Sequence, residues 1–246
     1  MKLDDAKKLH QKKYRTQLGY YLVEGEHLVL ELQKAAKQSP ENFIKTQLYV
    51  TEEYQEWANQ LDSPFKIFTI SKKQMGQLSD TKTPQGIIAC VPLPNLKQNA
   101  QSTEERCIYL HEVQDPGNLG TILRTLAWFG NFRLLLSPNS VDPFNPKVVR
   151  SSMGAIFHVP MELEIGLSDL QDRFDRFAYL DMQGQKISDQ TFADYPCYLF
   201  GNEARGVPRE TLDAFNATAF TIPGSGSIES LNLAMAVSMS VYQLAV

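Results

Sequence analysis

The sequence predicts an α/β fold built on a parallel β-sheet, and two observations carry that prediction. Short apolar segments alternate with amphipathic helical segments along most of the 246 residues. Strands separated by helices in this way form parallel sheets with helices on both faces. Hydrophobic residues make up 43% of the chain and charged residues 21%, which is typical of a globular protein with a substantial core.

A change in charge along the chain indicates a domain boundary. Residues 1–106 contain 13 Lys, 2 Arg and 13 acids, a net charge of +2, whereas residues 107–246 contain 2 Lys, 7 Arg and 15 acids, a net charge of −6. The stretch PLPNLKQNAQSTEER near this boundary is polar and contains prolines, as linkers do. We therefore expect one domain over residues 1–96, a linker over 97–106 and a second domain over 107–246.

The first domain is expected to be a small α/β unit. Its segments in order are a strand leading into a helix (20–36), a strand (46–51), a helix (52–61), a strand (65–70), a helix capped by Ser71 (71–79) and a buried strand (86–91). Five basic residues crowd the stretch from Lys7 to Arg15. That stretch is either a solvated helix face or a phosphate-binding arm.

The second domain begins with the strand CIYLHEV and a helix that follows an Asp-Pro-Gly turn. We expect Asn118 to cap that helix and Gly130 to end it. Further strands are expected over 132–137, 177–182, 197–201 and 217–222, a helix near 145–153 and a final helix to the end. After Glu229 the only ionisable side chain is Tyr242, so we expect this last helix to be covered on all sides.

Three glycine-containing turns, DPGNLG, GNEARG and PGSGSIES, follow strands of the second domain. Ligands of parallel α/β sheets bind at the carboxyl ends of the strands, so these turns are the candidate site. The third turn lacks the Gly-Lys-Ser/Thr ending of a phosphate-binding P-loop. It also has Glu229 where a dinucleotide fingerprint needs glycine. A nucleotide phosphate loop is therefore excluded.

The residues also carry a family resemblance. HEVQDPGNLGTILRTLAWFG, YLFGNEARGVP and TIPGSGSIESLNLAMAVS resemble, in order and spacing, the three motifs of the SpoU (TrmH) family of RNA ribose 2′-O-methyltransferases, in the SPOUT superfamily. NPKVVRSSMGAIFHVP is also similar to this family, and YLVEGEHLV and TPQGIIACV resemble its L30e-like substrate-binding domain. Ala234 departs from the pattern, since many members have serine at this position.

The resemblance implies a deep trefoil knot at the C-terminus, S-adenosylmethionine as cofactor, a structured ribosomal or transfer RNA as substrate, and a homodimer formed through the C-terminal helix. The candidate catalytic residues are Arg124, Asn118, Glu203, Ser230 and Asn232, and the candidate cofactor-binding residues are Gly201, Ile222, Gly226, Leu231 and Met182. In this reading Arg124 holds a phosphate and assists deprotonation of the ribose hydroxyl. Glu203 orients Asn118 or Arg124.

Other classes of protein are less consistent with the sequence. Three scattered cysteines and four histidines form no metal-ligand pattern, so no metal is expected. No apolar run reaches the length of a membrane span and no secretory signal is evident, so we expect a cytoplasmic protein. A non-catalytic RNA-binding protein with the same fold is the main alternative, but Asn118, Arg124 and the Ser-Leu-Asn triplet are all retained. A methyltransferase acting on a base is disfavoured by the first motif.

Overall fold

The computed structural model describes residues 1–96 and 105–246, which form two compact units. The first unit consists of Met1–Asn95 together with Asp142–His158, and the second contains the other described residues. Most of the linker expected over 97–106 lies outside the described residues. Within the described ranges, no helix has the length and apolar character needed to cross a bilayer.

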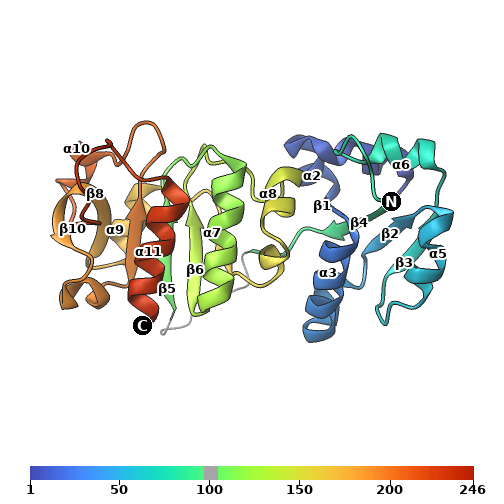
Figure 1. Ribbon diagram of the computed structural model, residues 1–246, viewed down its shortest axis with the longest axis horizontal. Helices are drawn as coiled ribbons and strands as arrows, with labels where there is room; N and C mark the ends of the chain where they lie inside the picture. The colour runs from blue at the N-terminus through green and yellow to red at the C-terminus, as the bar shows by residue number, and fades with distance from the viewer. Residues whose placement is uncertain (97–104) are drawn as a thin grey trace. The chain divides into compact units, whose positions relative to one another are not determined.

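The first unit is built on a mixed sheet of four strands in the order β1-β4-β2-β3 (Figure 1). Strand β4 pairs antiparallel with β1 and β2, while β2 and β3 are parallel. The elements are α1 (Leu3–Ala6), η1 (Lys7–His10), α2 (Lys12–Leu18), β1 (Tyr20–Glu24), α3 (Glu26–Gln38), α4 (Pro40–Phe43), β2 (Gln47–Val50), α5 (Glu52–Asn59), β3 (Lys66–Thr69), α6 (Lys72–Leu78), β4 (Ile87–Pro92), α8 (Pro146–Ser151) and η2 (Ala155–Phe157). The expected capping box of Ser71 and Gln74 is present at α6.

Two features of the first unit differ from the expectations. The segment Asp142–His158, which the charge boundary assigns to the second domain, belongs to this unit. Arg15, one of the basic residues expected to face solvent or phosphate, is only 3% exposed. Its guanidinium donates to the Asp142 carboxylate at 2.9 Å and to the carbonyl oxygens of Leu9 and His10. Arg15 therefore joins two distant segments and is not available to RNA.

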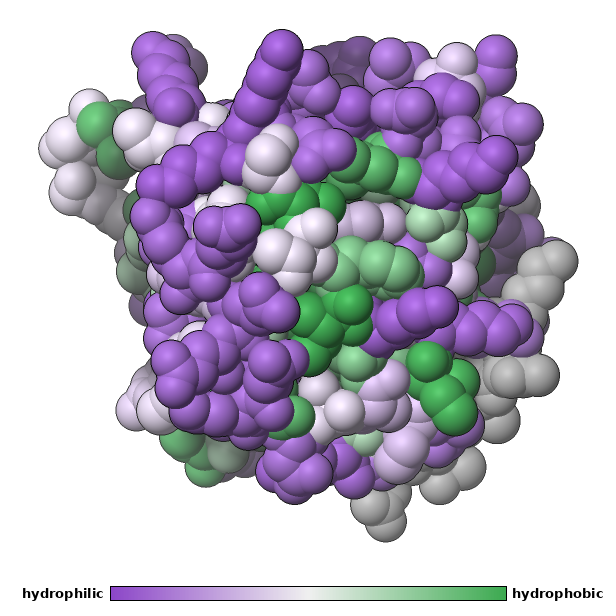
Figure 2. All heavy atoms as spheres, turned by 90° about the vertical axis from the view of Figure 1, so that its right-hand side faces the viewer, coloured by the Kyte–Doolittle hydropathy of each residue, from purple (hydrophilic) through white to green (hydrophobic). Residues whose placement is uncertain are grey.

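The surface of the first unit is mainly hydrophilic. Figure 2 looks at the face seen from the right of Figure 1 and shows hydrophilic side chains around a smaller apolar strip. Below this surface, a core cluster holds Leu9, Leu22, Tyr49, Met75 and Ile88, among others. Edge strand β3 contributes the half-buried Phe68, whose ring stacks on Tyr49.

The second unit confirms the parallel α/β fold. Its six strands have the order β10-β8-β9-β5-β6-β7, and every neighbouring pair is parallel. The elements are β5 (Arg106–Leu110), α7 (Pro116–Phe129), β6 (Phe132–Leu136), β7 (Met161–Glu162), α9 (Leu167–Arg173), β8 (Phe177–Lys186), η3 (Gln190–Asp194), β9 (Cys197–Phe200), α10 (Arg209–Leu212), β10 (Ala217–Thr221) and α11 (Leu233–Ala245).

The strand order has a consequence for ligand binding. From β5 the chain continues to β6 on one side of the sheet, and from β9 it continues to β10 on the other side. Strands β5 and β9 are adjacent, with Cys107 opposite Cys197 and Leu110 opposite Phe200. Crevices for ligands form at the carboxyl ends of strands where the order reverses in this way, so this edge is where a site is expected.

Helices α7 and α11 lie side by side on one face of this sheet (Figure 1). Thr125 and Ser238 share a hydrogen bond of 2.8 Å between their hydroxyls, and Phe129 packs edge-on against Tyr242. The inner face of α11 buries Val237, Val241 and others. Its outer face leaves Met235, Met239 and Tyr242 exposed, and Trp128 of α7 is 84% exposed. Within this unit, α11 is thus covered on one side.

Candidate active site

The N-terminus of α7 is capped by Asp115, not by Asn118 as expected from the sequence. The Asp115 carboxylate accepts from the backbone N–H of Asn118 at 2.7 Å, and Pro116 occupies the first helical position. Proline suits this position because it has no N–H to leave unbonded. The Asn118 side chain, in the first turn, is consequently free to bond elsewhere.

Glu203, in the turn after β9, binds this helix end. Its carboxylate accepts from the backbone N–H groups of Gln114 and Asp115, each at 3.1 Å, and from Asn118 Nδ2 at 3.3 Å. A carboxylate at a helix N-terminus is stabilised by the exposed N–H groups and by the helix dipole. Glu203 was expected to orient Asn118 or Arg124, and in the structure it binds Asn118.

Asn232 completes a hydrogen-bonded chain across the three glycine-containing turns. Its Nδ2 donates to Asn118 Oδ1 at 2.9 Å, while its own Oδ1 caps α11 by accepting from Met235 N at 3.3 Å. Asn118, Glu203 and Asn232, which are far apart in the sequence, therefore meet at the carboxyl edge of the sheet.

Two other candidate catalytic residues, Arg124 and Ser230, do not take part in these hydrogen bonds. Arg124 lies six residues after Asn118 on α7, which is roughly 9 Å along a helix axis. Its side chain is exposed and makes no hydrogen bond or ion pair with the described residues. Ser230 is exposed in the loop before α11. Within residues 1–96 and 105–246, neither side chain has a hydrogen-bond or ion-pair partner.

Three of the candidate cofactor residues, Ile222, Gly226 and Leu231, lie in the loop that follows β10, while Met182 lies in β8 and Gly201 directly after β9. Thr221 Oγ1 donates to the carbonyl of Met182 at 3.3 Å, so the residue before Ile222 is bonded to the start of the exposed part of β8. Met182 and Leu231 are exposed apolar side chains. Gly226 has a φ of +78°, which glycine adopts most easily.

Gly201 lies where only glycine fits. A Cβ atom at this position would be 2.2 Å from the backbone carbon of Gly206, because the turn after β9 folds back on itself through paired Asn202–Gly206 backbone bonds of 2.9 Å. The exposed apolar side chains of Met182 and Leu231 and the open loop around Gly226 fit a ligand with a flat heterocycle and a flexible tail. These residues therefore suit S-adenosylmethionine.

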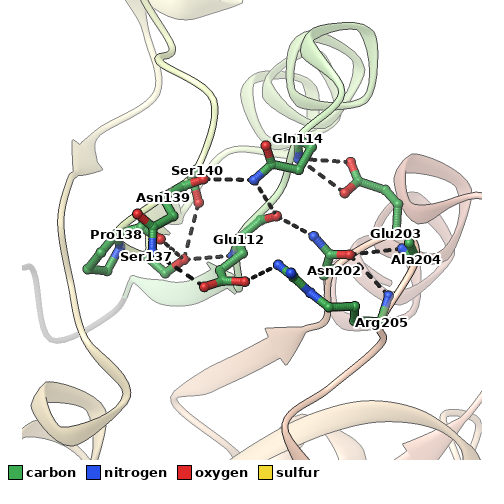
Figure 3. Close-up of polar contacts among 10 residues, drawn as sticks. All are labelled: Glu112, Gln114, Ser137, Pro138, Asn139, Ser140, Asn202, Glu203, Ala204 and Arg205. Atoms are coloured by element: carbon green, nitrogen blue, oxygen red, sulfur yellow. Dashed lines mark hydrogen bonds and ion pairs between the residues drawn. The ribbon is translucent and has the colours of Figure 1, made fainter.

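A second polar group, missed by the sequence analysis, lies beside Glu203 and Gln114 (Figure 3). The Glu112 carboxylate forms an ion pair with Arg205, and Asn202 Nδ2 donates to the Glu112 carbonyl at 2.6 Å. Nearby, burial lowers the pKa of His111. The non-glycine φ of +50° at Glu112 is a conformational signal that no local sequence pattern reveals.

Comparisons with known proteins agree with this geometry. The model of the SpoU rRNA Methylase family matches residues 105–242, and that of the MRM3-like substrate binding domain matches residues 2–89. The chain is 31% identical, over 99% of its length and 95% of the relative's, to the 23S rRNA (guanosine(2553)-2′-O)-methyltransferase RlmP of Bacillus subtilis.

Solved structures are similar over both units. A putative RNA methyltransferase of the TrmH family from Porphyromonas gingivalis has a TM-score of 0.80 and 28% identity, covering 98% of this chain and 96% of that one. The AdoMet-bound rRNA methyltransferase from Sinorhizobium meliloti has a TM-score of 0.80 and 25% identity, covering 98% and 93%. The chain therefore belongs to the SpoU family of RNA ribose 2′-O-methyltransferases, which use S-adenosylmethionine as the methyl donor.

Proposed function

We propose that this enzyme methylates a ribose 2′-oxygen in ribosomal RNA, with Asn118 and Arg124 at the reacting hydroxyl. The observation that carries the proposal is the hydrogen-bonded chain Glu203–Asn118–Asn232, which joins the three motif segments at one edge of the sheet. A relative 31% identical to this chain is named for methylation of a guanosine in 23S rRNA, which supports the choice of substrate.

The roles of the side chains follow from their chemistry. A guanidinium does not give up its proton readily, so Arg124 holds a phosphate and stabilises the alkoxide that develops on the 2′-oxygen, rather than acting as a base. Asn118 is fixed by Glu203 and Asn232 and positions the ribose. Glu203 is a positioning residue, and Ser230 offers a hydroxyl beside Asn232.

The cofactor is assigned to the residues around the third loop. Met182, Ile222 and Leu231 supply apolar contact, Gly226 leaves open space beside the backbone, and Gly201 lets the turn after β9 fold back tightly next to the site. When bound, S-adenosylmethionine supplies a methyl group activated by its sulfonium. The protein's own contribution is to hold the ribose hydroxyl in line with that methyl group, since proximity and alignment account for much of the rate of such transfers.

We further propose that the enzyme is a homodimer with a C-terminal trefoil knot. The exposed Trp128, Met235, Met239 and Tyr242 on α7 and α11 support the dimer, because clustered apolar side chains of this kind mark interfaces. Met239→Lys should dissociate or unfold the protein, because an unpaired buried ammonium costs several kcal/mol. Sedimentation velocity checks this, and a stable monomer of the wild-type protein at micromolar concentration contradicts the dimer.

The first unit is proposed to recruit the RNA. Its match to a substrate-binding domain and the net charge of +2 over residues 1–106 support this role. Lys13 is exposed and lies over the Tyr14 ring, whereas Lys7 and Lys8 pair with Asp4 and Asp5. Lys13→Glu should therefore weaken RNA binding and lower its dependence on salt. Equal affinity at all salt concentrations contradicts the role.

Arg124→Ala tests the proposed chemistry. The variant should lower kcat for methyl transfer at least 100-fold, because a group that stabilises the transition-state charge is lost. Its affinity for S-adenosylmethionine should stay within a few-fold of the wild type, since the cofactor residues lie elsewhere. Single-turnover transfer of labelled methyl groups to ribosomal RNA measures the first effect, and calorimetry measures the second.

The controls separate charge from geometry. Arg124→Lys should recover little activity, because an ammonium cannot reproduce the planar fork of a guanidinium. Arg176→Ala removes another exposed arginine, whose guanidinium donates to the Asp194 carbonyl, and should leave activity within about two-fold, as surface substitutions usually do. Full activity of Arg124→Ala contradicts the assigned centre, and an inactive wild-type protein that binds RNA supports the non-catalytic alternative.

A further inference from the structure

An open hollow lies among the turns that follow β5, β6 and β9, and none of the candidate cofactor residues lines it. Its volume is about 540 Å³, and it is lined by Glu112, Gln114, Asn139, Asn202, Ala204 and Arg205. This volume lies within the range of small-ligand sites. The hollow also lies at the adjacent strands from which the chain leaves toward opposite sides of the sheet, the usual place for a ligand in a parallel α/β fold.

The walls of the hollow are fixed by hydrogen bonds to the backbone. The N–H of Glu112 donates to Ser137 Oγ at 2.6 Å, and its carbonyl accepts from Asn202 Nδ2 at 2.6 Å and from Gln114 Nε2 at 3.1 Å. Gln114 Nε2 also donates to the Asn139 carbonyl at 2.7 Å (Figure 3). These bonds hold Glu112 at its φ of +50°, a conformation that costs a non-glycine residue free energy and persists only where its surroundings impose it.

The side chains that line the hollow retain unused hydrogen-bonding capacity. Arg205 is 69% exposed, and one of its five N–H groups binds Glu112. The Glu112 carboxylate is 25% exposed, and its only other contact with a described side chain is a 3.5 Å bond from Asn139. A carboxylate accepts about four hydrogen bonds. The hollow therefore offers acceptors and donors side by side.

We propose that this hollow binds the guanine base of the nucleotide to be methylated, an inference that rests on the proposed function. The Watson–Crick edge of guanine presents two neighbouring donors, N1–H and N2–H, beside the acceptor O6. Glu112 accepts from the two donors and Arg205 donates to O6. Adenine, cytosine and uracil do not place two donors together on this edge. Proteins that recognise unpaired RNA bases read these edges.

The position of the hollow agrees with this ligand. Gln114 borders the hollow with its side chain, and its backbone N–H binds Glu203, which also holds Asn118. A base in the hollow therefore lies next to the residues assigned to its ribose. A phosphate group is disfavoured in the hollow, because it would meet the negative carboxylate of Glu112.

The first measurement identifies the methylated nucleoside. Ribosomal RNA from cells that lack the gene is incubated with the full-length protein and labelled S-adenosylmethionine, then digested to nucleosides and separated. The expected product is 2′-O-methylguanosine. Any other methylated nucleoside overturns the guanine assignment and leaves the proposed function intact. An absence of methyl transfer contradicts the proposed function itself.

The second measurement uses RNA in which the target guanosine is replaced by inosine, which lacks the N2 amino group. The wild-type enzyme should lose about 10-fold in kcat/KM, as expected for one missing base contact. Glu112→Gln, which keeps the backbone contacts, should prefer guanosine over inosine by less than about two-fold. Its control, Glu210→Gln, removes another exposed carboxylate, on α10, and should keep the 10-fold preference.

A second variant, Arg205→Ala, keeps the proposal testable if Glu112→Gln fails to fold. Arg205 is exposed, so its removal should leave the fold intact. This variant should also lose discrimination between guanosine and adenosine at the target. If both variants keep the wild-type preference, the hollow does not read the base. If methyl transfer is undetectable, an NMR titration of the protein with guanosine and adenosine monophosphates tests whether the hollow prefers guanine. Guanosine monophosphate must then bind at least several-fold more tightly, and equal affinities overturn the assignment.

Discussion

The turns that follow β5 and β9 and the loop that follows β10 belong to the three motif segments, but the protein holds them in different ways. The first two turns are cross-linked by side chains, with Glu203 binding backbone N–H groups of the β5 turn and Asn202 binding its carbonyl. In the third loop, a Cβ atom at Gly224 or Gly226 would have no neighbour within 4 Å. Within that loop the side-chain bonds are local, such as Ser225 Oγ to Ser227 Oγ at 2.9 Å, and the bond to a distant segment comes only at its end, where Asn232 donates to Asn118.

This difference matches the roles proposed for the two regions. A site that is already ordered binds its ligand without a further entropy cost, and this favours accurate placement of a reacting hydroxyl. An open loop must be ordered when its ligand binds, and that cost lowers affinity. We therefore expect substitutions in the cross-linked turns to change stability and kcat, and substitutions in the open loop to change cofactor affinity.

The largest effect is expected for Gly201→Ala in the cross-linked turn. Its added Cβ would lie 2.2 Å from the Gly206 carbon and 2.5 Å from Val207 N, so backbone atoms must move. Overpacking costs about 1–3 kcal/mol, and we expect a loss at the upper end of that range because backbone atoms are displaced. Urea unfolding of the variant measures the loss of unfolding free energy.

Gly224→Ala is the matched control for that prediction. It makes the same chemical change in the open loop, where the added methyl group has no neighbour, and should alter the unfolding free energy by less than about 0.5 kcal/mol. If both variants are equally stable, the two regions do not differ in packing.

The contrast between these regions was only partly predictable from the sequence. The alternation of strands and helices and the glycine spacing predicted the parallel sheet and three turns at its carboxyl edge, because these patterns are local. The cap at Asp115, the burial of Arg15 and the Glu112–Arg205 ion pair depend on partners distant in sequence. Propensity alone ranks asparagine and aspartate as nearly equal caps, so only the helix start found in the structure distinguishes Asn118 from Asp115.

A smaller effect is expected for Glu203→Gln. The variant keeps one acceptor oxygen but loses the negative charge at the N-terminus of α7, where the carboxylate binds three donors. The unfolding free energy should fall by about 1–2 kcal/mol. Methyl transfer should fall about 10- to 100-fold in kcat because Asn118 is no longer held. The affinity for S-adenosylmethionine, measured by calorimetry, should change less than three-fold.

Glu229→Gln makes the same change in the open loop, where the side chain is exposed. Its unfolding free energy should stay within about 0.5 kcal/mol of the wild type. Comparison of the two variants by urea unfolding isolates the contribution of the helix end. A loss of cofactor affinity in Glu203→Gln as large as its loss of kcat contradicts a role in positioning the ribose.

The smallest effect on the fold, and the sharpest test of the contrast, is expected for Gly226→Ala. Alanine at the φ of +78° found at Gly226 costs about 1 kcal/mol. In the free protein the open loop can relax away from this conformation, so the unfolding free energy should change by less than about 0.5 kcal/mol. If the bound loop keeps this φ, the cost appears on binding and raises the Kd for S-adenosylmethionine about five-fold.

Calorimetry of Gly226→Ala beside Gly224→Ala, whose φ is outside the left-handed region, separates the backbone effect from that of the added methyl group. A stability loss in Gly226→Ala as large as that in Gly201→Ala, with unchanged cofactor affinity, means that the third loop is as firmly held as the other two turns.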